Sequence, residues 1–514
     1  MNQTIAPKGI WKVIAASSAG TLIEWYDFYI FGSLAPIIAT HFFPKGNPTA
    51  ALLSTLATFA AGFIVRPFGA LVFGRLGDLI GRKYTFLLTL VLMGGSTFAI
   101  GLVPGYTTIG FAAPLIVLLL RLLQGLALGG EYGGAATYVA EHAPAGRRGY
   151  YTSWIQTTAT LGLFFSLGVI LITRHLLAPD AATSIQRFET WGWRIPFLIS
   201  ILLVIVSIYI RLKMHESPLF SKLKAEGKVA VNPLKESFGH KANLKMVLLA
   251  LFGATMGQGV VWYTGQFYAQ SFIENVCKID FDQSRTMLLW AILFATPFFV
   301  VFGGWSDKIG RKWIMMAGLL LAITTYHSIF KQFITLSDPA TRTCTNTELV
   351  QVTTKAIDKN PSDSIRVVTS NIHYADGAVF KQLKTDTLFA GAARTATTKT
   401  SIVYKDKKLD NASYWKFVGW FFVLVMYVTM VYGPIAAFLV ELFPTRIRYT
   451  SMSLPYHIGN GVFGGLTPFI ATLLTTIYVN DHLSGLWYPV IVAAMCLLIG
   501  VVYISNRIDP DVND

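Results

Sequence analysis

Long apolar segments restrict the fold of this sequence more than any other feature. A helix that crosses a lipid bilayer needs about 20 mostly apolar residues. Segments this long with so few charges would leave a soluble helical protein without a polar face, so the sequence predicts an all-α membrane protein with twelve transmembrane helices. The predicted helices lie at 12–38, 51–73, 84–103, 111–139, 150–173, 191–211, 245–271, 284–302, 313–334, 414–440, 450–477 and 486–505.

The charged residues also indicate a membrane protein. They make up 13% of the chain, about half of the roughly 25% that is usual in soluble domains. The formal net charge of +15 raises the question of a nucleic-acid partner. However, the basic residues form short clusters between apolar segments, and no basic face is interleaved with aromatic residues. We therefore expect the lipid bilayer as the partner, and no nucleic acid.

Lysine and arginine are distributed unevenly between the two sets of connecting loops. Twelve spans place both termini on one side, and the short loops of the opposite side contain only Lys45, Arg174, Arg187 and Lys278. By the positive-inside rule, both termini are cytoplasmic. The first apolar segment has no obvious small-residue cleavage site, so we interpret it as a retained helix and not as a signal peptide.

An internal repeat divides the chain into two halves. The stretch GRLGDLIGRK at 74–83 matches GGWSDKIGRK at 303–312. A second match, at a larger offset, joins 132–153 to 432–453 and aligns Glu141 with Glu441 and Arg148 with Arg448. The first match has identical residues at five positions with the same spacing, in the pairs Gly74/Gly303, Asp78/Asp307, Gly81/Gly310, Arg82/Arg311 and Lys83/Lys312.

The difference between the two offsets requires an insertion in the second half. The domains we predict are a six-helix bundle at 1–211, a cytoplasmic central loop at 212–244, helices seven to nine at 245–334, an insert at 335–412, and helices ten to twelve with the tail at 413–514. The two bundles should be pseudo-symmetric. The insert should lie on the extracytoplasmic side, and alternating runs such as IRVVTS suggest strands. A small β-rich domain and a partly disordered loop both remain open.

The repeated decapeptide places a carboxylate just before a tight turn and two cations just after it. Asp78 and Asp307 can pair with the following arginine, or accept backbone N–H bonds at the start of the next helix, where the helix dipole favours negative charge. Such a contact is a latch between helices. The alternative is a positive-inside anchor with an incidental acid, which explains the cations but not the spacing of the glycines and the acid in both halves.

The decapeptide resembles the loop motif of the major facilitator superfamily. EWYDFYIFG at 24–32, VRPFGALVFG at 65–74, RLLQGLALGGEYGGA at 121–135, WGWRIPF at 191–197 and ELFPTRIRYTS at 441–451 resemble the metabolite:proton symporter family. The resemblance covers the whole chain except the insert. It implies transport of small carboxylates, shikimate-like acids, proline or betaine across a bacterial inner membrane.

Several ionisable residues fall inside predicted spans, where a charge costs about 2.5–3.5 kcal/mol on insertion scales. In related sugar porters, a span-one carboxylate is thought to work with a span-four arginine. The resemblance therefore makes Asp27 and Arg121 the proposed proton-coupling pair, with Glu24 and Glu131 as alternatives. A carboxylate that alternately meets and leaves an arginine releases and binds a proton. Static ion pairs between helices remain the other interpretation.

Polar and aromatic residues in spans two, seven and eleven are candidate substrate ligands. They lie beside glycine and proline, which suits a cavity at the interface of two repeats. Helix–helix hydrogen bonding and aromatic packing are the alternatives. The candidates are Arg66, Gln258, Trp262, Tyr263, Gln266, Tyr456, His457 and Asn460. Glu141, Arg148, Glu441 and Arg448 join the two decapeptides in a predicted cytoplasmic gate.

The predicted function is secondary active transport of a small-molecule solute together with a proton, by a monomer. An enzyme is disfavoured because no nucleophile elbow, HExxH motif, Walker A loop or haem motif is present. We expect no cofactor and no metal, since Cys277, Cys344 and Cys496 lack metal-ligand spacing. The alternative is a transporter-fold nutrient sensor that uses the insert as a binding module. Sodium coupling stays open.

Overall fold

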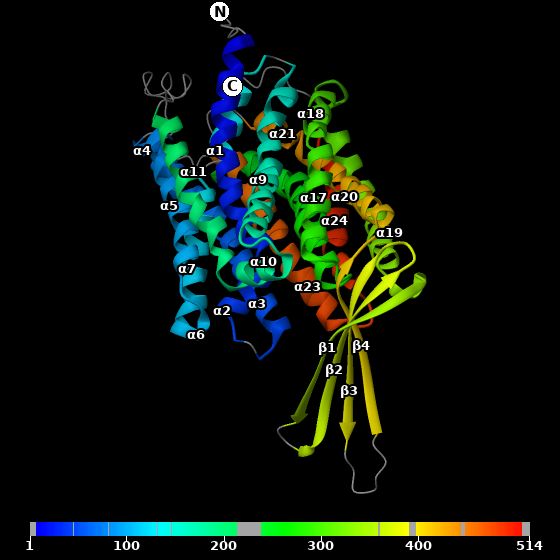
Figure 1. Cartoon of the computed structure of the whole chain (residues 1–514). Coiled ribbons are helices and arrows are strands. Elements are labelled where there is room, and N and C mark those ends of the chain that lie inside the picture. Colours follow the sequence, from blue (N-terminus) through cyan, green and yellow to red (C-terminus); the bar gives the residue numbers. More distant parts are fainter. Residues whose placement is uncertain are drawn as a thin grey trace, which may run out of the picture. The chain divides into compact units, whose positions relative to one another are not determined.

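Helices occupy all twelve predicted segments in the computed structural model (Figure 1). The structure describes residues 7–44, 46–80, 82–130, 132–144, 146–212, 238–357, 360–389, 397–443 and 448–505. In the first half, the helices are α1 (Pro7–Ser33), α2 (Ala35–Phe42), α3 (Pro48–Ile64), α4 (Arg66–Ile80), α5 (Arg82–Leu102), α6 (Tyr106–Ile109), α7 (Ala112–Leu128), α8 (Tyr132–His142), α9 (Arg148–Leu176), α10 (Ala181–Arg187), the π-helical turn η1 (Phe188–Gly192) and α11 (Arg194–Leu212).

The second half contains more helices that are interrupted by π-helical turns. They are α14 (Lys241–Ala250), η2 (Leu251–Thr255), α15 (Met256–Tyr263), η3 (Thr264–Tyr268), α16 (Ala269–Asn275), α17 (Phe281–Ala295), α18 (Pro297–Ile309), α19 (Arg311–Leu336), α20 (Asn411–Tyr432), α21 (Ile435–Leu442), α22 (Arg448–His457), η5 (Ile458–Gly464), α23 (Thr467–Ile477) and α24 (Trp487–Tyr503). Short 3₁₀ turns lie at η4 (Pro339–Thr341) and η6 (Ser484–Leu486).

The helices are long and apolar enough for a multi-pass membrane protein. Among the described residues, eight helices meet the requirements of length and hydropathy for a span, or nine if the bent pair Ala182–Gly192 and Arg194–Val206 counts as one. Leu88–Leu102 and Ala112–Leu128 are shorter apolar helices.

Proline and glycine interrupt several spans near their middle. Pro67 lies at the start of α4, directly after the break at Val65, and Pro297 opens α18 after Thr296. Proline lacks an N–H group, so it is tolerated at the first turn of a helix but not in its interior. Spans seven and eleven contain the π-helical turns η2, η3 and η5, and such turns are frequent at functional sites.

The described residues fold into two compact units. The first comprises Met1–Tyr268, Ile292–Tyr326 and Val423–Asp514, and it contains most of the helices. The second comprises Ala269–Ala291 and His327–Phe422, which includes the insert.

The insert forms a four-stranded antiparallel sheet, which confirms the predicted β-rich domain. Its strands are β1 (Cys344–Ile357), β2 (Asn360–Tyr374), β3 (Val379–Phe389) and β4 (Thr397–Lys408), and they lie side by side in chain order (Figure 1). The β2–β3 hairpin turns at Gly377, whose φ of 89° suits glycine. Tyr374 and Phe380 pack in a small core at this end of the sheet, with ring centroids 4.9 Å apart.

The base of the sheet is fixed by Arg342. Its guanidinium bonds to Asp376, to Asp410 at 2.9 Å, to the Leu336 carbonyl at 2.8 Å and to the Ser413 hydroxyl at 3.0 Å. Burial alone would raise the pKa of Asp410, but hydrogen bonds from Ser413 and Arg342 hold it below its usual range. One arginine therefore joins the sheet to the end of α19 and the start of α20.

We predict that Arg342→Met destabilises the second unit. The variant keeps the aliphatic bulk but leaves Asp410 without its cation, and losing hydrogen bonds to a charged group costs about 3 kcal/mol. Limited proteolysis of the purified protein should cut the insert faster, and thermal unfolding should begin at a lower temperature. Arg366→Met on the exposed side of β2 is the matched control. Equal protease resistance in both variants would contradict the role of Arg342.

Candidate functional site

Spans seven and eleven approach each other closely in the first unit. A Cβ atom on Gly259 would lie 2.5 Å from the carbonyl oxygen of Gly459, so only glycine permits this approach of the two backbones. At the adjacent positions, the side-chain amides of Gln258 and Asn460 donate to each other at 3.0 and 2.9 Å. Gln258 and Asn460, two predicted substrate ligands, therefore hydrogen-bond to each other and join the two spans.

Aromatic rings from spans one and seven meet in a buried cluster. Trp25 and Tyr29 of α1 stack at 5.0 Å, and Tyr29 stacks on Trp262 of α15 at 5.5 Å. Tyr263 and Phe267 extend the cluster, with centroids 5.7 Å apart. Trp262 and Tyr263 are predicted site residues, and the structure brings them together. Sequence reasoning missed Trp25 and Tyr29, although both lie in the EWYDFYIFG motif.

Arg66 lies at the start of α4 and is almost fully buried. Its guanidinium carbon is 4.0 Å from the ring centroid of Phe63, 4.9 Å from that of Phe28 and 5.4 Å from that of Trp25. Its Nε and Nη2 atoms have no hydrogen-bond partner within the described part of the chain. Aromatic faces stabilise the cation, while its N–H groups remain available to a ligand.

Other buried polar atoms around this cluster also lack partners among the described residues. They are the Tyr29 and Tyr263 hydroxyls, Trp262 Nε1, both amide atoms of Gln266 and both ring nitrogens of His457. Buried polar groups in native proteins nearly always have a hydrogen-bond partner from protein or water. This concentration of unsatisfied donors and acceptors makes the cluster a candidate binding site for a polar ligand.

A tyrosine network connects the two halves next to this site. The rings of Tyr132 on α8 and Tyr456 on α22 stack at 3.7 Å, nearly parallel. Tyr456 also shares a 2.7 Å hydrogen bond with Tyr432, and Gln156 donates to the Tyr132 hydroxyl at 2.5 Å. Tyr456 was a predicted ligand, and its hydroxyl is satisfied here by Tyr432.

Asp27 and Arg121 are both fully buried in the first unit. Neither oxygen of Asp27 has a hydrogen-bond partner among the described residues. Arg121 donates to Gln124 at 2.8 Å and to the Phe59 carbonyl at 3.3 Å, and its guanidinium lies 4.1 Å from the Phe28 ring centroid. The two charged groups therefore have separate surroundings, and Arg121 is held by neutral oxygens and by aromatic faces.

The second decapeptide joins the two halves. Asp307 of α18 accepts backbone N–H bonds from Gly149 at 2.9 Å and Tyr150 at 2.8 Å, in the first turn of α9. It also pairs with Arg311 at 2.6 Å. A carboxylate at a helix N-terminus satisfies exposed N–H groups and complements the helix dipole. The helix it caps belongs to the opposite half of the chain.

Arg311 and Lys312 have different partners. Arg311 bonds to both oxygens of Glu441, at 2.9 and 3.2 Å, and this bidentate geometry is the strongest arrangement for such a pair. Lys312 donates to the carbonyl oxygens of Val501 and Ile504 at the end of α24. Gly310 has a φ of 104° at the turn between α18 and α19, which explains the glycine.

Glycines allow α9 and α18 to touch beside this polar cluster. A Cβ on Gly149 would lie 2.3 Å from Arg311 Nη1 and 2.4 Å from the Gly303 carbonyl. A Cβ on Gly303 would lie 2.5 Å from Ser153. The contact therefore closes this end of the first unit. Arg148 opens α9 next to it and is partly buried.

Several predicted site residues lie outside the described part of the structure. Glu131 and Gly81 are not described at all, and only the backbone is described for the remaining ones. These are Glu24, Gly74, Asp78, Arg82, Lys83, Glu141 and Arg448.

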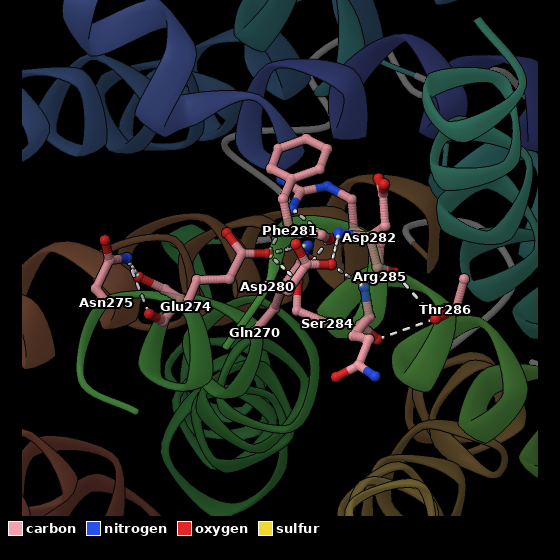
Figure 2. Close-up of polar contacts among 11 residues, drawn as sticks. Gln270, Glu274, Asn275, Asp280, Phe281, Asp282, Ser284, Arg285 and Thr286 are labelled. Atoms are coloured by element: carbon pink, nitrogen blue, oxygen red, sulfur yellow. Dashed lines mark hydrogen bonds and ion pairs between the residues drawn. The ribbon is translucent and has the colours of Figure 1, made fainter. Parts of the chain in front are cut away.

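The second unit contains a buried ion pair that sequence reasoning did not identify (Figure 2). Arg285 of α17 donates to Glu274 of α16 at 2.5 Å, and the same carboxylate oxygen accepts from Ser284 at 2.5 Å and from Gln270 at 3.2 Å. The Arg285 guanidinium also lies 3.4 Å from the Phe281 ring centroid. These contacts tie α16 to α17.

Comparisons with known proteins agree with a transporter. The family model "Sugar (and other) transporter" matches residues 12–244. The inner membrane metabolite transport protein YhjE of Escherichia coli (strain K12) is 33% identical over 91% of this chain and 88% of its own length. The alpha-ketoglutarate permease of the same organism is 29% identical over 96% of this chain and 93% of its own length. A proline/betaine transporter of that organism is 33% identical over 60% of this chain and 61% of its length.

Solved structures show the same fold. The proton:xylose symporter XylE bound to 6-bromo-6-deoxy-D-glucose superposes with a TM-score of 0.64 at 16% identity, over 96% of this chain and 94% of that one. Fold and relatives together define a membrane carrier and not an enzyme. The chain belongs to the major facilitator superfamily, in its sugar and metabolite transporter family.

The Gly149–Gly303 contact gives a testable prediction. Gly149→Val should destabilise the protein by about 1–3 kcal/mol, since overpacking a close contact costs that much. Gly168→Val is the matched control on the same helix, because a Cβ there would meet nothing within 4 Å. Thermal unfolding in detergent measures both, and equal melting temperatures for the two variants would argue against the contact.

Proposed function

We propose that this protein is a proton-coupled symporter of a small organic acid or zwitterionic metabolite. Twelve spans in two pseudo-symmetric six-helix bundles, with domain bounds as expected from the sequence, would alternate access across the inner membrane in a monomer. The cytoplasmic termini and the extracytoplasmic position of the insert belong to the same proposal. The relatives whose names include alpha-ketoglutarate and proline/betaine support this range of solutes.

The observation that carries the proposal is the buried Arg66 with unpartnered N–H groups. A carboxylate is the group that best satisfies such a guanidinium, through short charge-assisted hydrogen bonds. Trp262, Tyr263, Gln266 and His457 would bind the rest of the solute. Gln258, Asn460 and Tyr456 would set the positions of spans seven and eleven.

Proton coupling is assigned to Asp27 and Arg121. A fully buried carboxyl group without a donor or cation is far less costly as the neutral acid, so we assign Asp27 as protonated in this conformation. Movement of α1 relative to α7 would bring Arg121 to Asp27 and release the proton. Glu24 and Glu131 remain the alternative carriers of this proton.

Access would be controlled at two levels. On the cytoplasmic side, the gate comprises the second decapeptide with Glu441 and, by the repeat, the first decapeptide with Glu141, Arg148 and Arg448. Toward the opposite end, Phe267 packs against Gly32 and Phe59, since a Cβ on Gly32 would lie 2.6 Å from the Phe267 ring. The Asp307 contact with α9 and the Phe267 contact with Gly32 are both made in the structure, and both would have to open in turn during transport.

Arg66→Met should weaken solute binding. Losing a charge-assisted hydrogen bond costs about 1.5–3 kcal/mol, which raises KM or Kd by about tenfold to 100-fold. Arg66→Lys keeps the charge but loses the planar guanidinium, which can bond to both oxygens of a carboxylate. This variant should therefore recover only part of the affinity. Uptake into proteoliposomes, with a panel of carboxylates, amino acids and betaines, measures this. Unchanged KM for every transported solute in Arg66→Met would exclude Arg66 as a ligand.

Arg121→Ala should abolish accumulation of solute against its gradient while the protein stays folded. Asp27→Asn should also abolish accumulation but retain exchange of solute between the two sides, because the neutral amide mimics the protonated acid. Arg187→Ala, at the exposed end of α10, is the control. An uncoupler should collapse accumulation by the unchanged protein. Full accumulation by Arg121→Ala would reject the pairing, and binding without any transport by the unchanged protein would favour the sensor.

A further inference from the structure

The two edges of the insert sheet differ in regularity. The pairing of β1 with β2 has three register shifts, between Cys344 and Asn346, between Leu349 and Gln351, and between Ala356 and Ile357. β4 pairs with β3 without interruption from Thr397 to Lys405. Bulges protect an edge strand from pairing with another chain. The irregular β1 edge is therefore poorly suited to pairing with a further strand, whereas the regular β4 edge is well suited to it.

The outer edge of β4 already pairs with one extended segment of this chain. Lys407 donates its backbone N–H to the Lys278 carbonyl at 2.9 Å, and its carbonyl accepts from Asp280 N–H at 3.0 Å. Ile279 forms a parallel bridge with Lys407. This segment, between α16 and α17, covers only the base of β4. Between Thr397 and Lys405, the outer side of β4 has no neighbouring strand within the described residues.

Side chains along this open part expose apolar groups between polar ones. Ile402 and Val403 are 54% and 43% exposed and point to opposite faces of the sheet. Thr400 and Ser401 are also exposed. An added strand with aliphatic residues at successive positions would cover both side chains.

The charges near the open edge favour an acidic partner. Lys405 and Lys408 are exposed, and no contact of their ammonium groups with a carboxylate is found among the described residues. The carboxylates nearby are already engaged: Asp406 pairs with Lys381 at 3.3 Å, and Asp386 accepts from Thr400 at 2.7 Å. A second copy of β4 would bring the same unpaired lysines against this edge, and like charges across a strand pair are destabilising.

We propose that the β4 edge of the insert, from Thr400 to Lys405, binds an acidic extended segment of a partner protein by adding it as a fifth strand. Backbone hydrogen bonds supply affinity, and Ile402, Val403 and Lys405 supply selectivity. This interaction goes beyond solute transport and does not depend on the proposed solute or on proton coupling.

The test uses the purified full-length chain in detergent and a fluorescein-labelled peptide, Glu-Thr-Glu-Val-Val-Glu-Thr-Glu, whose two successive valines point to opposite faces of the added strand. Fluorescence anisotropy should show saturable binding that weakens as salt rises, because exposed charges are screened. Peptides N-methylated at alternate residues provide the decisive comparison. Only one of the two alternating sets faces β4, so one set should lose binding by about tenfold or more, and the other should bind like the parent.

Two variants locate the site. Lys405→Glu should weaken the acidic peptide about tenfold and strengthen a peptide with lysine in place of glutamate. Lys331→Glu, at an exposed lysine of α19, is the control and should change neither. Both variants should accumulate solute normally, which separates this proposal from the transport mechanism.

Three outcomes would overturn the proposal. The first is no saturable binding of the acidic peptide. The second is equal loss of binding for both N-methylated sets, which would indicate a contact through side chains alone. The third is a dimer of the chain, seen by light scattering and dissociated by Lys405→Glu, because the occupant of the edge would then be a second copy.

Discussion

The cost of burying charge and polar backbone away from water governs this structure. Asp307 meets this cost in two ways at once, since it satisfies two N–H groups at the start of α9 and neutralises Arg311. Glu441 of α21 pairs with the same guanidinium. A cluster of this kind is stable only while all its members are together, because removing one partner leaves another charge buried and unpaired. The closed contact between α9 and α18 therefore depends on a complete set of partners.

In the buried cluster around Arg66, by contrast, several polar groups have no partner among the described residues. Arg66, Gln266 and His457 are buried with atoms that no described group satisfies. Such groups are costly in an empty protein and become favourable when a ligand meets them. The two regions thus differ in what satisfies their polar groups. The contact between α9 and α18 is satisfied by the protein itself, whereas the cluster around Arg66 keeps atoms without a partner among the described residues.

The sequence predicted the positions of the helices well, because span length and hydropathy act locally along the chain. For Asp307 it offered either the following arginine or the N–H groups at the start of the next helix. The arginine pair is present, but the N–H groups belong to α9 of the other half, a partner that depends on tertiary packing. Alternation in IRVVTS indicated a strand, whereas the anchoring of the sheet by Arg342 involves residues far apart in sequence. Tyr29 was missed because an aromatic residue in a span is most often a packing residue. Asp27 and Arg121 are buried, and their exchange of partners stays a prediction.

Lys312 follows Arg311 directly in the decapeptide, yet its contacts are with the last turn of α24. Those carbonyl groups end a helix and lie within the same half of the chain as α19. The two neighbouring cations therefore bind different parts of the chain, since Arg311 bonds to Asp307 and Glu441 whereas Lys312 bonds to the end of α24. If the two halves rock as proposed, Lys312 would keep the last span attached to the α18–α19 turn while the contacts of Arg311 open.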